Sequence, residues 1–127
     1  MNTSNYEQKI INMLRAANVR FEREKTFSDL KGGKFRYDFY LPFYNILIEV
    51  DGEQHFKQIK KFQKTRTDFL KQQENDRRKN SYALANKITL IRIPYWEMDK
   101  LKVFNDLFQS KFLVKSKWHN DYLIPKS

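Results

Sequence analysis

The stretch Arg36-Tyr-Asp-Phe-Tyr-Leu-Pro-Phe-Tyr-Asn-Ile-Leu-Ile-Glu-Val-Asp-Gly-Glu-Gln-His55 decides the fold of this chain. Its aromatic and β-branched residues predict two short strands, and Leu41–Asn45 between them has the composition of a turn. The second strand, Ile46–Asp51, carries apolar residues on both faces, which indicates a strand that is covered on both sides. Gly52 ends this strand.

Three acids stand in these strands, where acids are uncommon: Asp38, Glu49 and Asp51. Because side chains alternate along a strand, Glu49 and Asp51 share one face, and Asp38 approaches them if the strands pair. Crowded carboxylates repel one another unless a cation lies between them, and a hard divalent ion is the natural candidate. The pattern predicts metal-assisted phosphodiester chemistry, with the Val50 carbonyl as a further ligand. The alternative is a surface hairpin whose acids are simply exposed.

Length and charge restrict the class of protein. The 127 residues fit one domain with a core of its own, rich in Phe and Tyr. The chain carries 25 Lys and Arg against 15 Asp and Glu, and its formal net charge of +10 favours a polyanionic partner. The alternative is that the excess lysine only keeps a small domain soluble.

Cysteine and hydropathy restrict the setting. The chain has no Cys, which excludes disulfides and thiolate zinc sites and is typical of a reducing cytosol. It has no apolar run long enough to span a bilayer, and its N-terminus has no signal-peptide hydrophobic region. We therefore expect a soluble, intracellular protein in the cytoplasm, with no membrane partner.

The elements before the deciding stretch are a helix and a strand. Ser4 and Glu7 form a capping-box pattern that predicts the start of the helix. A strand is expected across 19–27, and the glycine pair in Lys31–Lys34 predicts a hairpin turn into the Asp38 strand. The apolar face of the helix is expected to contain Ile10, Met13, Leu14 and Ala17.

The elements after it are a helix, a strand and a helix. Thr65–Asp68 predicts the start of a basic helix that reaches about Asn86, with Tyr82, Leu84 and Ala85 packing on the sheet. Ile88–Ile93 is a β-branched strand bounded by Pro94. A last helix is expected from about Glu97 to Lys111, with Leu101, Phe104, Leu107 and Phe108 on its buried side. This order indicates one α/β domain with a mixed sheet.

Asp38 followed by Glu49-x-Asp51 resembles the core of the PD-(D/E)XK nucleases, with Asp51 where that superfamily usually has Lys. A closer resemblance is to the very-short-patch-repair-like (EDxHD) endonucleases, including stand-alone copies among phage and mobile-element homing endonucleases. The segments Thr65–Phe69, Glu74–Arg78 and Leu90–Glu97 resemble the family's next helix and strand. The residues that match the EDxHD signature in chain order are Glu7, Asp38, the Val50 position, His55 and Asp76.

This resemblance implies a restriction-endonuclease-like core, a mixed β-sheet of about four strands flanked by helices. It implies a single nuclease domain over 1–127, with the core at about 4–111 and a basic, aromatic tail at 112–127. It also implies a phage- or mobile-element-encoded protein. The short-patch repair members bind a structural zinc. Because this chain has no Cys, we expect neither that zinc nor mismatch specificity.

The resemblance also implies roles for the site residues. Mg²⁺, for which Mn²⁺ would substitute, would be held by Asp38, Glu49, Asp51 and the Val50 carbonyl. His55 would act as the general base in place of the missing Lys, and Asp76 would orient its imidazole or hold the water network. Each role has an alternative: His55 as an ordinary loop residue, Asp76 on a solvated helix face, and Glu7 as a helix cap rather than a metal or water contact.

A basic stretch that follows the site predicts binding to phosphates, with DNA as the partner, double-stranded or branched. Gln54 is a further candidate for contact with phosphate or with the metal's water shell. The basic residues are Lys57, Lys60, Lys61, Lys64, Arg66, Lys71, Arg77, Arg78 and Lys79.

These observations predict a metal-dependent DNA endonuclease, a nickase or a homing-type enzyme. One alternative is a non-catalytic nucleic-acid-binding module on a nuclease-like fold. Another is a junction resolvase or an RNase that uses the same core. The sequence leaves the choice between monomer and homodimer open.

Overall fold

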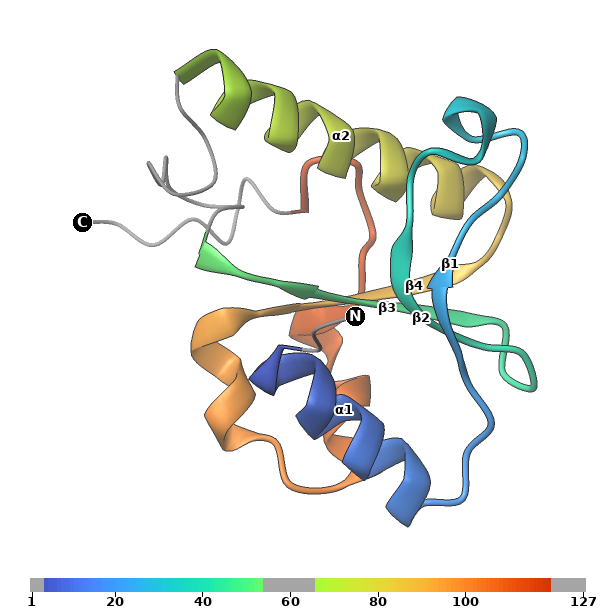
Figure 1. Ribbon diagram of the computed structural model, residues 1–127, viewed down its shortest axis with the longest axis vertical. Coiled ribbons are helices and arrows are strands. Elements are labelled where there is room, and N and C mark those ends of the chain that lie inside the picture. Colours follow the sequence, from blue (N-terminus) through green and yellow to red (C-terminus); the bar gives the residue numbers. More distant parts are fainter. Residues whose placement is uncertain (1–3, 54–65, 120–127) are drawn as a thin grey trace.

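The computed structural model describes residues 4–53 and 66–119 (Figure 1). Four strands form one sheet in the order β1-β2-β3-β4. The pairs β1–β2 and β2–β3 are antiparallel, whereas β3 and β4 are parallel. The strands are β1 (Glu22–Lys25), β2 (Tyr37–Leu41), β3 (Ile46–Asp51) and β4 (Thr89–Pro94). The predicted α/β fold, a mixed sheet of about four strands with flanking helices, is confirmed.

Helices cover both faces of the sheet (Figure 1). α1 (Asn5–Ala16) and the 3₁₀ helices η3 (Tyr95–Lys100), η4 (Phe104–Phe108) and η5 (Ser110–Phe112) contribute to the core on one face. α2 (Arg66–Ala85) lies on the other face and joins the two parallel strands β3 and β4. Ile48 points to the first core and Leu47 to the second, as the predicted alternation along β3 requires.

The predicted helix start is confirmed. The Ser4 hydroxyl oxygen accepts a hydrogen bond from the Glu7 N–H, which satisfies one of the unpaired donors of the first turn. Ile10, Met13 and Leu14 are buried, and so is Ile11. Ala17, which we placed on the apolar face, is exposed because it lies at the C-terminal end of α1.

The first strand is shorter than predicted. Val19 and Phe21 pack on the α1 side before β1 begins, and Phe27 packs on the α2 side after it ends. Glu24 has a positive φ of 53°, which interrupts the alternation of a regular strand. Lys31–Gly33 forms the 3₁₀ helix η1, in which Gly32 and Gly33 both have positive φ. The connection to β2 is therefore longer than the expected hairpin turn.

The prediction of a last helix from Glu97 to Lys111 is wrong. Three short 3₁₀ helices replace it, and Asp106 explains the break between the first two. Its carboxylate accepts hydrogen bonds from the N–H groups of Lys102 and Val103, and so begins a new turn at η4. Leu101 and Leu107 are buried as predicted, whereas Phe108 is 41 % exposed.

Two further details concern α2 and the chain after it. Ala83 is the buried residue near the end of α2 and Tyr82 packs beside it, whereas Leu84 and Ala85 are exposed. The chain turns at Asn86 and Lys87 before β4 begins. Val114 then returns to the sheet, and its N–H donates to the Leu90 carbonyl. Within the described ranges, no helix is long and apolar enough to cross a membrane.

Candidate active site

Asp38 and Glu49 lie where β2 and β3 separate. The ladder between the two strands runs from Leu41↔Ile46 to Phe39↔Ile48. Beyond it, side chains replace the backbone partners. The Asp38 N–H donates to Glu49 Oε1 at 2.7 Å, and the Val50 N–H donates to Asp38 Oδ2 at 2.7 Å. These reciprocal hydrogen bonds fix both carboxylates at one end of the strand pair.

Lys79 reaches this carboxylate pair from α2. Its Nζ donates to Glu49 Oε2 at 2.5 Å and to the Arg36 carbonyl, just before β2. The side chains of Lys79 and Glu49 are 12 % and 4 % exposed, so solvent screens their ion pair only weakly. Nζ also lies 4.9 Å from the centre of the Tyr37 ring. Lys79 is therefore a fixed ammonium group beside the acids.

Glu7 approaches the pair from α1. Arg23 in β1 donates to Glu7 Oε2 at 2.6 Å, and the Ser4 hydroxyl donates to Glu7 Oε1 at 3.1 Å. The helix cap and a contact with the site are thus compatible roles for this one side chain.

A cavity of about 540 Å³ connects these groups. Its lining brings together four residues predicted for the catalytic centre, Glu7, Asp38, Glu49 and Val50. It also contains Lys79, which the sequence placed among the basic residues that bind phosphates. The remaining lining residues are Ser4, Tyr6, Gly52, Glu53 and Tyr95.

The environment of Asp38 disfavours its charged form. Burial raises the pKa of this carboxyl well above its usual range, and the negative charges of Glu49 and Glu7 add to the effect. The Val50 N–H and the Lys79 ammonium oppose the rise without cancelling it. A proton or a cation would relieve this crowding of oxygen atoms.

Asp51 and Asp76 lie in a different environment, around the buried Arg92. Arg92 Nη1 donates to Asp51 Oδ1 at 2.6 Å, and Nη2 lies 3.7 Å from Asp76 Oδ1. Arg92 Nε donates to Asn80 at 2.6 Å. Burial alone would lower the pKa of Arg92, but the surrounding acids raise it above its ordinary value, so the guanidinium stays charged. Neither Asp51 nor Asp76 is among the residues that line the cavity with Asp38.

Arg92 also connects the two groups of acids. Its Nη1 lies 3.8 Å from Glu49 Oε2, and Glu49 pairs with Arg92 in the register of β3 and β4. The guanidinium thus lies between Glu49 and Asp51 on the α2 side of the sheet, and it positions both carboxylates.

The structure describes only some of the remaining predicted residues. Gln54, His55, Lys57, Lys60, Lys61 and Lys64 lie outside the described residues. Arg66 is exposed at the start of α2, Arg78 is exposed further along it, and Arg77 is partly buried against Trp118. In the part of the chain that the structure describes, no three His, Cys, Asp or Glu side chains form a group that could hold a metal ion.

Sequence reasoning missed the structural roles of Lys79, Asn80 and Arg92. The spacing of Asp76, Asn80 and Ala83 was a usable signal, because it marks one buried face of a helix that otherwise reads as polar. Arg92 was visible as a lone charge inside the apolar strand Ile88–Ile93. Such a residue requires buried acids as partners.

Part of the chain is similar in sequence to a viral protein. The uncharacterized protein 307L of Invertebrate iridescent virus 6 is 37 % identical over 71 residues. The match covers 54 % of this chain and 36 % of that protein, so the chain spans little more than a third of its length. No known family profile and no solved structure matches the chain.

Proposed function

We propose that this protein is a divalent-cation-dependent endonuclease that hydrolyses phosphodiester bonds in DNA, of the PD-(D/E)XK type that its sequence resembles. The observation that carries the proposal is the interlocked pair Asp38 and Glu49, held at the end of two strands in a cavity with Glu7 and Lys79. A structural ion pair would not require a second and third carboxylate beside it.

The donor set fits Mg²⁺. Asp38 and Glu49 supply carboxylate oxygens, and Val50, whose carbonyl is the predicted neutral donor, lines the same cavity. Burial and the negative charge of Glu49 raise the pKa of Asp38, and a cation beside it would favour the charged carboxylate. A bound ion of this kind polarises a phosphate oxygen and makes a nearby water more acidic. Asp51 is ion-paired with Arg92, and in this proposal its role is to hold the Arg92 guanidinium in position. The role of Asp51 as a metal ligand stays a prediction from the sequence.

Lys79 supplies the positive charge that the usual superfamily Lys would contribute. That position holds Asp51 in this chain, whereas Lys79, from α2, lines the cavity that contains Asp38 and Glu49. Its hydrogen bonds to Glu49 and to the Arg36 carbonyl hold it in place before substrate binds. A fixed cation of this kind stabilises negative charge that develops on a phosphate in the transition state.

The proton acceptor for the attacking water stays a prediction. His55 follows β3 by four residues in the chain and is the candidate general base. The charge of the whole chain, +10, supports a polyanionic substrate, and DNA is the substrate that the resemblance implies.

The test is nicking of supercoiled plasmid with Mg²⁺, Mn²⁺ or EDTA, comparing the natural chain with Asp38→Asn. Asp99→Asn is the matched control, because Asp99 is an exposed acid of η3 outside the cavity lining. We expect metal-dependent nicking by the natural chain and the control and none by Asp38→Asn. Equal nicking by all three would refute the site.

A non-catalytic nucleic-acid-binding module is the second candidate. It is favoured by the fact that Glu49 already has three cationic or N–H neighbours: Lys79, Arg92 and the Asp38 N–H. Binding of plasmid, branched DNA and RNA without cleavage of any of them would support this candidate instead.

A further inference from the structure

A second cavity, of about 510 Å³, lies between η1, α2 and the C-terminal segment. Glu74, Arg78 and Tyr82 line this cavity, and their spacing of four residues places them on one face of α2. Lys79, which lines the first cavity, lies on a different face of the helix. We call it the aromatic-basic pocket and define it by Lys31, Phe35, Arg77, Arg78, Lys117 and Trp118.

We propose that the aromatic-basic pocket binds an unpaired nucleotide of single-stranded DNA. The base would pack against Trp118 and Phe35, and the neighbouring phosphates would pair with the cations at the rim. This inference rests on the proposed function, and it specifies which form of DNA the enzyme engages.

The charge of the pocket fits a polyanion. Four of its lining residues are cationic, and a single acid, Glu74, opposes them. Arg78 Nε lies 3.9 Å from Glu74 Oε1, and both side chains are at least half exposed, so this ion pair is weak and leaves Arg78 available to a phosphate. An apolar peptide or a neutral ligand would leave this positive charge without a counterpart.

The aromatic residues supply a surface for a base. Trp118 is 42 % exposed, although it lies beside the charged groups of Arg77 and Lys117, each 4.7 Å from its ring centre. Phe35 is partly exposed on the opposite segment of chain and packs against the core beneath. Partly exposed rings with cations around them are the combination by which proteins bind single strands, since every base has a face that can stack.

Two segments connect this pocket to the candidate active site. Phe35 and Asp38 are three residues apart, so their Cα atoms are separated by at most about 11 Å. Arg78 and Lys79 are adjacent in α2 and line one pocket each. A strand held in the aromatic-basic pocket would therefore reach the carboxylates within a few nucleotides.

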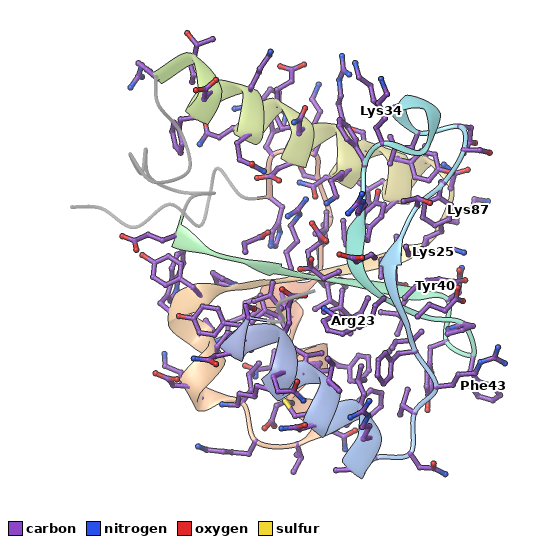
Figure 2. The ribbon with its side chains drawn as sticks, in the orientation of Figure 1. Arg23, Lys25, Lys34, Tyr40, Phe43 and Lys87 are labelled. Carbon is purple, nitrogen blue, oxygen red and sulfur yellow. The ribbon has the colours of Figure 1, made fainter. Side chains whose placement is uncertain are left out.

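The experiment measures binding of a fluorescein-labelled oligothymidylate and of a blunt duplex of the same length, in EDTA so that no cleavage occurs. The variants are Trp118→Ala and Arg78→Gln. The controls are Phe43→Ala, an aromatic side chain that is 86 % exposed, and Lys87→Gln, an exposed cation. In Figure 2, Phe43 projects at the β2–β3 turn.

We expect Trp118→Ala to weaken binding of the oligothymidylate at least about fivefold, with little change for the duplex. Arg78→Gln should weaken it and make its salt dependence shallower by about 0.7 in the log–log slope, the value for one phosphate on a single strand. Neither control should differ from the natural chain by as much as twofold, or about 0.4 kcal/mol.

A second measurement does not require the loss of Trp118. The chain has two Trp residues, so a Trp96→Phe background leaves Trp118 as the only indole reporter. Saturable quenching of its fluorescence by oligothymidylate supports the proposal, and an unchanged spectrum at saturating DNA overturns it. An equal loss of duplex and single-strand binding in Trp118→Ala also overturns it.

The outcomes separate this inference from the proposed function. A natural chain that nicks plasmid but binds oligothymidylate equally with and without Trp118 refutes the inference alone. A chain that binds oligothymidylate through Trp118 but cuts no DNA with any divalent ion refutes the nuclease and retains the single-strand site.

Discussion

The backbone N–H of Asp38 donates to the Glu49 side chain, and the Asp38 side chain accepts from the N–H that follows Glu49. Each acid thus replaces a ladder hydrogen bond where β2 and β3 diverge. The consequence is that two carboxylates which repel each other are fixed by the same interactions that end the strand pair.

Asp38→Asn tests the charge of this pair without removing its hydrogen bond, because an amide oxygen can still accept from the Val50 N–H. We expect a loss of cleavage on the order of a hundredfold or more, since one carboxylate ligand and its charge are removed. Millimolar Mg²⁺ should raise the melting temperature of the natural chain by mass action but not that of Asp38→Asn. Calorimetry measures this apart from activity, and an equal Mg²⁺ response in both proteins would contradict the ligand assignment.

Lys79→Met tests the ammonium group from α2. The change leaves Glu49 without its nearest cation in a mostly buried position, so we expect a loss of about 1–3 kcal/mol in the free energy of unfolding. Lys71→Met, at an exposed position of the same helix, should change it by less than about 0.5 kcal/mol. Urea unfolding measures both free energies. Under conditions in which Lys79→Met is still folded, its nicking rate should be lower than that of the natural chain. Full activity would remove Lys79 from the site.

Arg92→Met tests the buried network on the α2 side. The change removes the buried cation that Asp51, Asp76 and Glu49 share, so we expect a loss of about 3–5 kcal/mol in the free energy of unfolding. Arg20→Met is the control, because Arg20 is exposed. If urea denaturation gave both variants the same midpoint, the network would carry no stability.

His119 predicts a dependence of stability on pH. Burial and the positive charge of Arg92 lower its pKa to about 4 from an ordinary value of 6.5, so the unfolded chain binds the proton more tightly than the native one. The contribution to stability is complete above about pH 6.5 and is lost as pH falls toward about 4.

His119→Gln should therefore flatten the dependence of the melting temperature on pH in this window. The other His of the chain provides the matched control, and His55→Gln should retain the dependence. A slope that is the same in His119→Gln as in the natural chain would show that this imidazole is protonated as easily in the folded state as in the unfolded one.

Much of the fold followed from local patterns. The Ser4 cap, the turn at Leu41–Asn45 and the strand Ile46–Asp51 depend on neighbours within a few residues, and the structure has them where they were expected. The helix predicted from Glu97 failed because Asp106 binds two backbone N–H groups, and apolar spacing carries no information on such a bond. The first strand is present but shorter than predicted, and the positive φ of Glu24 interrupts its period of two.

The sequence by itself determined that acids crowd the ends of two adjacent strands, because side-chain alternation and a short turn leave them few other positions. Only the tertiary structure decided which of these acids line the cavity and which surround Arg92. Asp38 and Glu49 line a cavity with Glu7 and Lys79, whereas Asp51 and Asp76 surround Arg92. The physical reason is that Lys79 and Arg92 arrive from α2 and β4, far along the chain, and buried charges are stable only where such partners meet them.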